Sequence, residues 1–350
     1  MIKRILDHRA AGVNASSLMA GLLDRVVGQD PVIQKIVGVY RRFTAGMGDP
    51  TRPAGSILML GPTGTGKTRT VEAMAEHLYG NARAVIKVDC GEFQRDHEIA
   101  KLIGSPPGYT GHRETQPMLN QEVLNQHFTD SVKMALVLFD ELDKASDALW
   151  NLLLGILDKA TLTLGDNRRV DFSQAMVFCT CNTGSREIAD SLVPSMGFSV
   201  QPSLDSARLR QKIAKIGTAA ARRRFTPEFL GRFDEILSFV PLGEKEVARI
   251  LDIELEHVAR RFASISGGAV VQICKAAKQV LLKEGTADPR SGARAIKRVI
   301  ERRVADSLGN LIASGSCGAN SKIGIDVSPA GDDLVFYALE RSAVAAAARA

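Results

Sequence analysis

One short stretch of this 350-residue sequence has the pattern of a phosphate-binding loop. The apolar run at residues 57–60 leads directly into a glycine-rich segment that ends in a lysine and a threonine. Glycines leave backbone N–H groups free to surround phosphate oxygens, Lys67 supplies positive charge for the β- and γ-phosphates, and Thr68 offers a hydroxyl to Mg²⁺. We therefore predict a site for a nucleoside triphosphate and Mg²⁺, formed by Gly61, Pro62, Thr63, Gly64, Thr65, Gly66, Lys67 and Thr68.

Three polar side chains at the ends of apolar runs could carry out hydrolysis. Asp140 and Glu141 end one run, and Asn182 ends another. Asp140 suits the Mg²⁺ shell, Glu141 suits a base that polarises water, and Asn182 could hold that water or the γ-phosphate. An Asp-Glu pair can also be a helix N-cap with a solvated neighbour. The phosphate-binding loop favours the catalytic interpretation.

Phosphoryl transfer also needs positive charge near the transferred group, and two arginines are candidates. Arg232 lies on a turn after Pro227 and before a strand-like run, and Arg294 opens a helical pattern near the C-terminus. Without a family pattern, the favoured interpretation of each is an ordinary surface arginine.

Strand and helix patterns alternate in the first two thirds of the chain. This alternation predicts an α/β fold with a parallel sheet and helices on both faces, in which ligands bind at the carboxyl ends of the strands. We expect one helix to start at Pro31 with Asp30 as its cap, and another over 117–128. The predicted buried strands are 57–60, 84–90, 134–141 and 175–182.

From Gly243 the pattern changes to long amphipathic stretches followed by two short strand-like runs. This predicts a smaller, mainly helical C-terminal domain with a short strand pair and helices over 244–262, 268–284 and 291–313. The predicted divisions are a helical lead-in at 1–25, a nucleotide-binding domain at 26–241, the small domain at 242–341 and an Ala-rich tail at 342–350.

The composition is that of an ordinary globular protein, with 45% hydrophobic and 24% charged residues. No apolar run approaches the roughly 20 residues that span a bilayer, and no signal-peptide pattern is present, so we expect a cytoplasmic protein without a membrane partner. The net charge of +6 permits nucleic-acid contact without requiring it. Five scattered cysteines suggest neither disulfides nor zinc.

Several segments together resemble the Clp ATPases of the AAA+ superfamily, most closely the second ATPase module of the ClpA, ClpB and ClpC type. These segments are VVGQD, GPTGTGKT, IGSPPGYTG, LFDELDKA, TLTLGDNRRVDF, FTPEFLGRFDEILSFVPL and GARAIKRVIE. The resemblance covers nearly the whole chain from Val26 to about Leu339. It implies a homo-oligomer, a hexameric ring with ATP bound between neighbouring subunits.

The resemblance also implies roles for individual residues. Asp140 and Glu141 match the Walker B pair and Asn182 matches sensor 1. Arg294 matches sensor 2, which reaches the nucleotide of its own subunit, whereas Arg232 matches the arginine finger, which reaches the nucleotide of the next subunit. Val27 and nearby backbone would line the adenine pocket.

Tyr109 lies at the tip of a Gly/Pro-rich loop at 104–112. It resembles the pore-loop tyrosine of the Clp family, which grips an extended polypeptide, and an aromatic ring can do this without a particular sequence. Thr110 replaces the family's usual valine. Segment 112–133 is longer than is usual and lacks a double glycine. The resemblance therefore implies unfolded or tagged protein substrates, delivered directly or by an adaptor.

The segment VPSMGFSVQ resembles the loop by which ClpA and ClpC dock on the ClpP peptidase. The docking residues would be Met196, Gly197 and Phe198. A surface loop with Phe198 tucked under the sheet is an equal alternative.

Our leading functional hypothesis is an ATP-driven protein unfoldase or remodelling chaperone that threads polypeptide through a ring pore. The alternative is a nucleic-acid motor or clamp loader that uses the basic stretches at 222–224 and 290–303. A third possibility, a scaffold that binds nucleotide without cycling, is disfavoured because no catalytic position is missing.

Overall fold

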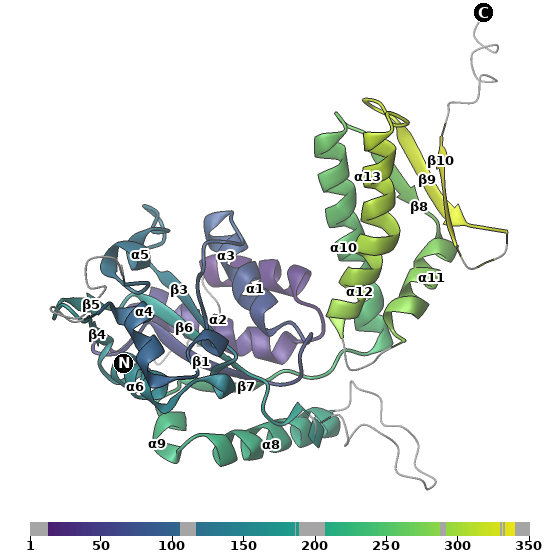
Figure 1. Cartoon of the computed structure of the whole chain (residues 1–350). Helices are drawn as coiled ribbons and strands as arrows, with labels where there is room; N and C mark the ends of the chain where they lie inside the picture. Colours follow the sequence, from purple (N-terminus) through teal and green to yellow (C-terminus); the bar gives the residue numbers. More distant parts are fainter. Residues whose placement is uncertain are drawn as a thin grey trace, which may run out of the picture. The chain divides into compact units, whose positions relative to one another are not determined.

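Five parallel strands form the sheet of the larger of two compact units (Figure 1). The computed structural model describes residues 13–105, 117–185, 187–188, 207–287, 292–329, 331 and 333–339. The strand order is β2-β3-β6-β1-β7, and all four predicted strands are present. The strands are β1 (Gly55–Leu60), β2 (Ile86–Asp89), β3 (Ala135–Asp140), β6 (Ala175–Cys181) and β7 (Glu235–Ser238).

The register brings the carboxyl ends of these strands to one edge. Asp89 on β2 pairs with Asp140 on β3, and Leu60 on β1 pairs with Cys181 on β6. Since the strands are parallel, the residues that follow β1, β3 and β6 lie side by side at this edge.

Alternate residues along each strand belong to two different cores, as a pleated strand requires. Leu58 and Val137 pack into one core and Ile57 and Leu136 into the other. Because both faces are covered, β1 and β6 are fully buried and read in sequence as continuous apolar runs. The parallel sheet with helices on both faces is therefore confirmed.

The helices divide between the two faces of the sheet. The second core takes residues from α1 (Val13–Arg25), α2 (Asp30–Thr44) and α3 (Lys67–Tyr79). The first core takes residues from the other helices of this unit, among them α4 (Ala100–Ile103), α5 (Gln121–Asn125), α6 (Asp147–Lys159), α8 (Ala207–Arg224) and α9 (Pro227–Leu230). Short turns of helix are η1 (Cys90–Glu92), η2 (Asp96–Ile99) and η3 (Leu142–Lys144).

Two local predictions were wrong in detail. Asp30 is the first residue of α2 and not its cap; Gln29 occupies the N-cap position without a side-chain cap bond. The helix predicted over 117–128 is only the short α5, capped by Asn120, whose side-chain oxygen accepts from Val123 N at 2.8 Å.

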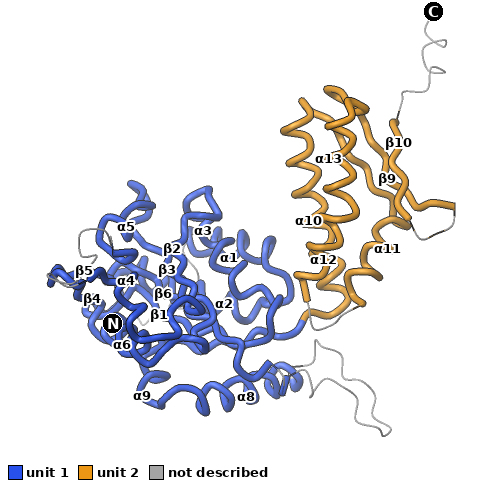
Figure 2. Tube along the Cα trace, in the orientation of Figure 1, with its two compact units in different colours: residues 1–241 blue, residues 242–350 orange. Residues whose placement is uncertain are grey.

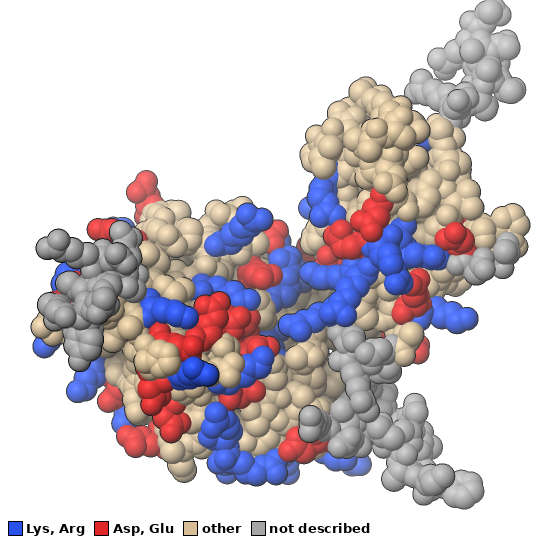
Figure 3. Space-filling view, viewed as in Figure 1, with Lys and Arg blue, Asp and Glu red and all other residues tan. Residues whose placement is uncertain are grey.

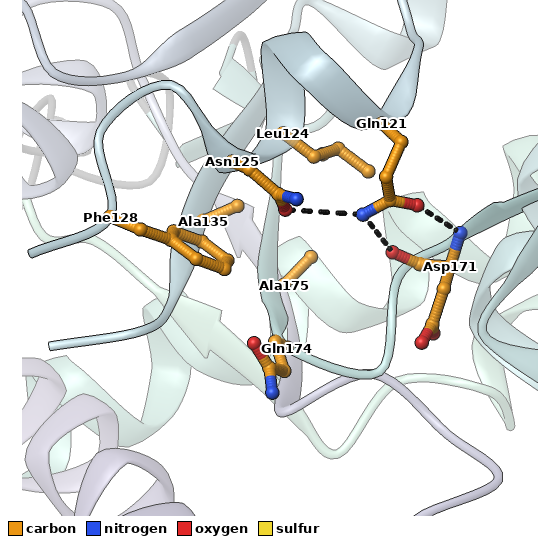
Figure 4. Close-up of a pocket in the computed structure, with 8 residues that line it drawn as sticks. All are labelled: Gln121, Leu124, Asn125, Phe128, Ala135, Asp171, Gln174 and Ala175. Atoms are coloured by element: carbon orange, nitrogen blue, oxygen red, sulfur yellow. Dashed lines mark hydrogen bonds between the residues drawn. The ribbon is translucent and has the colours of Figure 1, made fainter.

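A small hairpin, β4 (Thr161–Thr163) with β5 (Arg169–Asp171), was not predicted. Gln121 of α5 ties to it, because its Oε1 accepts from Asp171 N at 2.8 Å (Figure 4). The cavity shown there is lined by Ala135 and Ala175, at the amino ends of β3 and β6, and measures about 30 Å³. That is room for one water and not for a nucleotide.

The smaller unit comprises residues 242–350 (Figure 2). Its helices are α10 (Glu244–Ile265), α11 (Lys275–Gly285), α12 (Ala293–Ile300), the π-helical turn η4 (Glu301–Ala305) and α13 (Asp306–Ala313). Its sheet has the order β10-β9-β8. The strands are β8 (Val270–Ile273), β9 (Lys322–Val327) and β10 (Leu334–Ala338).

The start of the helix predicted over 268–284 was wrong. β8 occupies this region and pairs in parallel with β9, so the expected strand pair is a three-stranded sheet. The β-branched residues Val270, Val271 and Ile273 favour a strand, and α11 begins only after Cys274.

None of the helices in the described part of the chain has the length and apolar character needed to cross a bilayer. Cys90, Cys179 and Cys181 are buried free thiols, and burial raises the pKa of Cys181 to about 12. Cys179 and Cys181 both belong to the first core. These two cysteines are therefore small core residues.

Candidate nucleotide-binding site

The loop after β1 depends on glycine at three positions. Gly61, Gly64 and Gly66 have φ values of 139°, 75° and 100°, in the region that L side chains rarely adopt. A Cβ on Gly61 would also lie 2.6 Å from the Phe239 carbonyl oxygen. The chain therefore turns sharply between β1 and α3, which begins at Lys67.

Lys67 is directed into this loop and is only 6% exposed. Its Nζ donates to the carbonyl oxygens of Gly61 and Pro62 at 2.6 and 2.9 Å. It also donates to Asn182 Oδ1 at 2.9 Å. The loop lysine and the amide that follows β6 therefore meet directly, although 115 positions separate them.

Thr68 and Asp140 face one another across the same edge. Thr68 Oγ1 lies 3.5 and 3.4 Å from the two carboxylate oxygens of Asp140. Asp140 Oδ1 also accepts from Thr180 Oγ1 at 2.5 Å, and its Oδ2 pairs with Lys87 Nζ at 2.8 Å. A hydroxyl and a carboxylate converging on one point are oxygen donors of the kind that Mg²⁺ takes in phosphate sites, so these residues fit the metal.

The Asp140 carboxylate is held in its ionised form. Burial alone would raise its pKa, but hydrogen bonds from Lys87 and Thr180, together with the charges of Lys87 and Lys67, lower the pKa below its ordinary value. Asp140 is therefore available in the charged form that binds a divalent cation.

Glu141 adopts an uncommon backbone conformation, with φ of 59°. Its N–H donates to Thr180 Oγ1 at 2.8 Å, and its carboxylate pairs with Lys144 and accepts from Asn182 Nδ2 at 3.4 Å. A left-handed non-glycine residue persists only where surrounding contacts fix it, and such residues cluster at functional sites. Glu141 occupies the N-cap position of η3, but its side chain makes no capping bond and instead contacts Asn182 and Lys144.

Asn182 is fixed from both sides. Its N–H donates to Asp143 Oδ1 at 3.0 Å, while its side chain contacts Lys67 and Glu141. The structure thus joins three predicted residues in one hydrogen-bonded chain, to which Asp143 adds an unpredicted member.

Besides Asp143, sequence reasoning missed three further residues here. Thr180 is the buried polar residue within the otherwise apolar β6, which is a signal that could have identified it. Lys87 shows no such signal, since an exposed lysine on a strand is unremarkable. Gln29 is 1% exposed, and its Nε2 donates to the carbonyl oxygens of Thr65 and Val240 at 3.2 and 2.9 Å, which ties the turn before α2 to the phosphate loop.

Val27 lies in that same turn, half-buried, two residues before Gln29. Its neighbour Val26 lies 3.8 Å from the position of a Cβ on Gly66. The turn is therefore beside the phosphate loop, and the adenine-pocket role of Val27 stays a prediction.

Arg232 is not at this edge. Its Nη1 pairs with Asp158 Oδ1 at 2.6 Å and its Nη2 with Glu228 Oε1 at 3.7 Å. Its carbonyl accepts from Ser56 Oγ at 3.2 Å, near the amino end of β1, whereas the phosphate loop follows the carboxyl end.

Five other predicted site residues do not belong to the described part of the larger unit. Arg294 is exposed on α12 of the smaller unit, where its predicted role stays untested. Tyr109, Met196, Gly197 and Phe198 lie outside the described residues.

Both units of the chain match models of known protein families. Residues 52–236, more than half of the chain, match the family model "AAA domain (Cdc48 subfamily)". The chain belongs to this AAA family. Residues 242–325 match the model of the C-terminal, D2-small domain of ClpB protein, so both units resemble the second module of a Clp-type AAA protein.

Individual relatives agree. The chain is 36% identical over 318 residues to the chaperone protein ClpB of Bdellovibrio bacteriovorus, covering 90% of this chain and 34% of the relative. It is 33% identical over 312 residues to the chaperone protein ClpB of Mycobacterium bovis, covering 89% and 33%. The chain thus spans about a third of these curated relatives.

A solved structure is also similar. The Hsp104 chain in a closed-state cryo-EM reconstruction with ATPγS and FITC casein superposes with a TM-score of 0.75 at 27% identity. The match covers 93% of this chain and 52% of that one. The predicted resemblance to Clp ATPases of the AAA+ superfamily is confirmed.

Proposed function

We propose that this AAA protein hydrolyses ATP at the edge formed by the phosphate loop and the ends of β3 and β6. The observation that carries the proposal is the direct linkage of Lys67, Asn182 and Glu141, with Thr68 and Asp140 beside them. Five residues from three strand ends, each suited to one part of phosphoryl transfer, converge on one place.

Each residue has a role that follows from its position. Lys67 and the loop N–H groups bind the phosphates, and Thr68 with Asp140 would hold Mg²⁺, which neutralises charge on the phosphate oxygens. Glu141 accepts a proton from the attacking water, which Asn182 orients by its amide.

Arg232 would complete the site of a neighbouring subunit. Five residue steps along β1 lead from Ser56, which contacts the Arg232 carbonyl, to Gly61 at the start of the phosphate loop, a length of roughly 17 Å at about 3.3 Å per residue. An arginine side chain does not cover that distance. We infer that Arg232 acts in a homo-oligomeric ring, with six subunits as the expected number.

The work done by hydrolysis would be remodelling of polypeptides. The relatives are named chaperones, and the Hsp104 reconstruction is titled with casein. Tyr109, in a loop that matches a pore-loop pattern, is the residue expected to grip an unfolded or tagged chain.

A ClpP-type peptidase and an adaptor are not part of the proposed function. The relatives reported above are named ClpB and Hsp104, and neither name nor title refers to a peptidase. The cytoplasmic location stays a prediction.

The nucleic-acid alternative gains no support. Several arginines of the basic stretches are engaged within the chain: Arg223 pairs with Glu187, Arg224 donates to the Asp143 carbonyl, and Arg302 pairs with Glu284. On the face of the larger unit in Figure 3, acidic and basic side chains are interspersed and form no single basic stripe.

One set of measurements tests the proposal. The Glu141→Gln variant should bind ATP but turn it over about 10²- to 10⁴-fold more slowly, because a positioned base contributes that much. Mass measurement of this variant with ATP should show a ring.

Tyr109→Ala should keep ATPase activity and lose unfolding of a tagged substrate. Undiminished unfolding would rule out the threading mechanism, and undiminished turnover by Glu141→Gln would rule out the assigned base.

A further inference from the structure

Four aromatic rings stack in a row through the larger unit, a set we call the aromatic ladder: Trp150, Phe225, Phe229 and Phe233. Trp150 and Phe225 meet edge to face with centroids 5.2 Å apart. Phe225 and Phe229 are stacked at 5.4 Å, and Phe229 and Phe233 meet edge to face at 5.4 Å. The three phenylalanines are buried, so water does not reach the contacts between their rings.

One end of the ladder contacts the turn that carries Glu141. Trp150 Nε1 donates to the Leu142 carbonyl at 3.2 Å. Arg224 lies over the Trp150 ring at 4.2 Å, and its Nε and Nη2 donate to the Asp143 carbonyl at 3.2 and 3.0 Å. The peptide units directly after Glu141 are therefore clamped by the first ring and its cation.

The other end adjoins the loop that carries Arg232. Phe233 is its immediate neighbour in sequence, and the Arg232 carbonyl accepts from Arg52 and from Ser56 Oγ. Phe229 lies in α9, whose first turn is capped by Thr226. A movement of the Arg232 loop would therefore also move the rings of Phe229 and Phe233.

We propose that the aromatic ladder is a positioning device that couples the nucleotide state of one site to the Arg232 loop serving the next site. Close-packed rings cannot shift one at a time, since an interior at crystal-like density transmits displacement. A change at the Glu141 turn moves Trp150 and through the ladder the Arg232 loop, and engagement of Arg232 acts in reverse. The inference rests on the proposed shared site.

Trp150 is the single tryptophan of the chain and reports on the ladder directly. A reporter subunit would carry Lys67→Ala, so that its own site binds no ATP, and keep Trp150. A donor subunit would carry Trp150→Phe with Glu141→Gln, so that it binds ATP and is silent at tryptophan wavelengths. In mixed assemblies, an ATP-dependent change in emission can come only from the neighbour.

We expect ATP to change the reporter's emission, and Arg232→Ala in the reporter to abolish that change. Phe229→Met, which keeps side-chain volume but removes a ring, should reduce the amplitude at least about fivefold, the lower end of typical coupling between sites. The matched control is Phe172→Met, since Phe172 is equally buried in the same core but outside the ladder. Should Phe229→Met fail to fold, Arg224→Gln instead removes the exposed cation that links the Trp150 ring to the Asp143 carbonyl.

The outcomes separate the two proposals. Two results, each in assemblies of unchanged mass, would overturn the ladder and leave ATP hydrolysis in place. In the first, ATP bound to the donor leaves Trp150 emission constant. In the second, Phe229→Met and Phe172→Met give the same amplitude of emission change. Particles that stay monomeric with ATP overturn the shared site and the ladder with it.

Discussion

The two edges of the parallel sheet differ in how complete they are within one chain. At the carboxyl edge, the phosphate loop, Asp140 and Asn182 contact one another directly. At the amino edge, Arg232 is instead paired with Asp158 and Glu228, two carboxylates of its own chain. In the proposed function, the first edge binds the nucleotide, whereas the second would contribute Arg232 to the site of a neighbouring subunit.

The two edges also differ in how exposed their charged side chains are and in how firmly these are held. At the carboxyl edge, the phosphate-loop lysine Lys67 is buried and only 6% exposed. The Arg232 side chain is 37% exposed and held by exchangeable ion pairs. A group that must engage another subunit has to leave its present partners, so weak pairs at the surface suit it.

The largest expected effect comes from removing Arg232. Arg232→Ala should lower ATP turnover about 10³-fold, the lower end for an arginine finger, and leave ATP affinity nearly unchanged because the binding edge is intact. Lys67→Ala should instead abolish binding. Steady-state ATPase assays and equilibrium nucleotide binding distinguish the two.

Arg223→Ala serves as the matched surface control, since Arg223 is exposed and paired with Glu187. It should change turnover less than twofold. Equal turnover in Arg232→Ala and wild type would mean that the amino edge takes no part in catalysis.

The close approach of backbone segments at the carboxyl edge can be tested with two glycines. Gly61→Ala places a Cβ 2.6 Å from the Phe239 carbonyl oxygen at φ of 139°, and should cost about 1–3 kcal/mol of unfolding free energy. Gly38→Ala in α2 meets nothing within 4 Å and should stabilise by about 0.5–1 kcal/mol. Thermal unfolding of both variants measures the difference, and shifts of the same sign would contradict it.

A smaller effect is expected from freeing Arg232. Asp158→Asn removes the ion-pair partner that competes with the neighbour's phosphates for the guanidinium. Because surface pairs contribute at most about 1 kcal/mol, turnover should rise by no more than about fivefold. The same substitution in an Arg232→Ala background should have no effect on ATPase activity. A rise in that background would show that Asp158 acts by another route.

The smallest effect concerns Asp140 and Lys87. The pKa of Asp140 is lowered in the folded state, so its ionised form contributes stability above its ordinary value of 3.8, and this contribution is lost as the pH falls through the lower folded value. Lys87→Met should raise the pKa of Asp140, because the hydrogen bond and charge of Lys87 no longer offset the effect of burial.

The variant should therefore be less stable than wild type near pH 7, by no more than about 1 kcal/mol, and the difference should shrink as the pH approaches 4 and below. Urea unfolding across this range measures it. A difference that grows on acidification would have the wrong sign for this pair.

Much of the carboxyl edge could be predicted because its signals are local. A complete glycine loop after an apolar run, and polar residues ending two further runs, are visible within a few positions of one another. β8 was missed because a short strand in an apolar stretch cannot be told from a helix by periodicity alone, and its pairing with β9 decided the outcome.

The sequence by itself determined the phosphate loop, the parallel sheet and the polar residues at its edge, since glycine requirements and side-chain periodicity act over short spans of chain. Only the tertiary structure decided that Lys87 pairs with Asp140, that Arg232 is held by Asp158 at the opposite edge, and that Trp150 stacks on Phe225. These partners lie between 53 and 75 positions apart, and packing of two cores, not local propensity, brings them together.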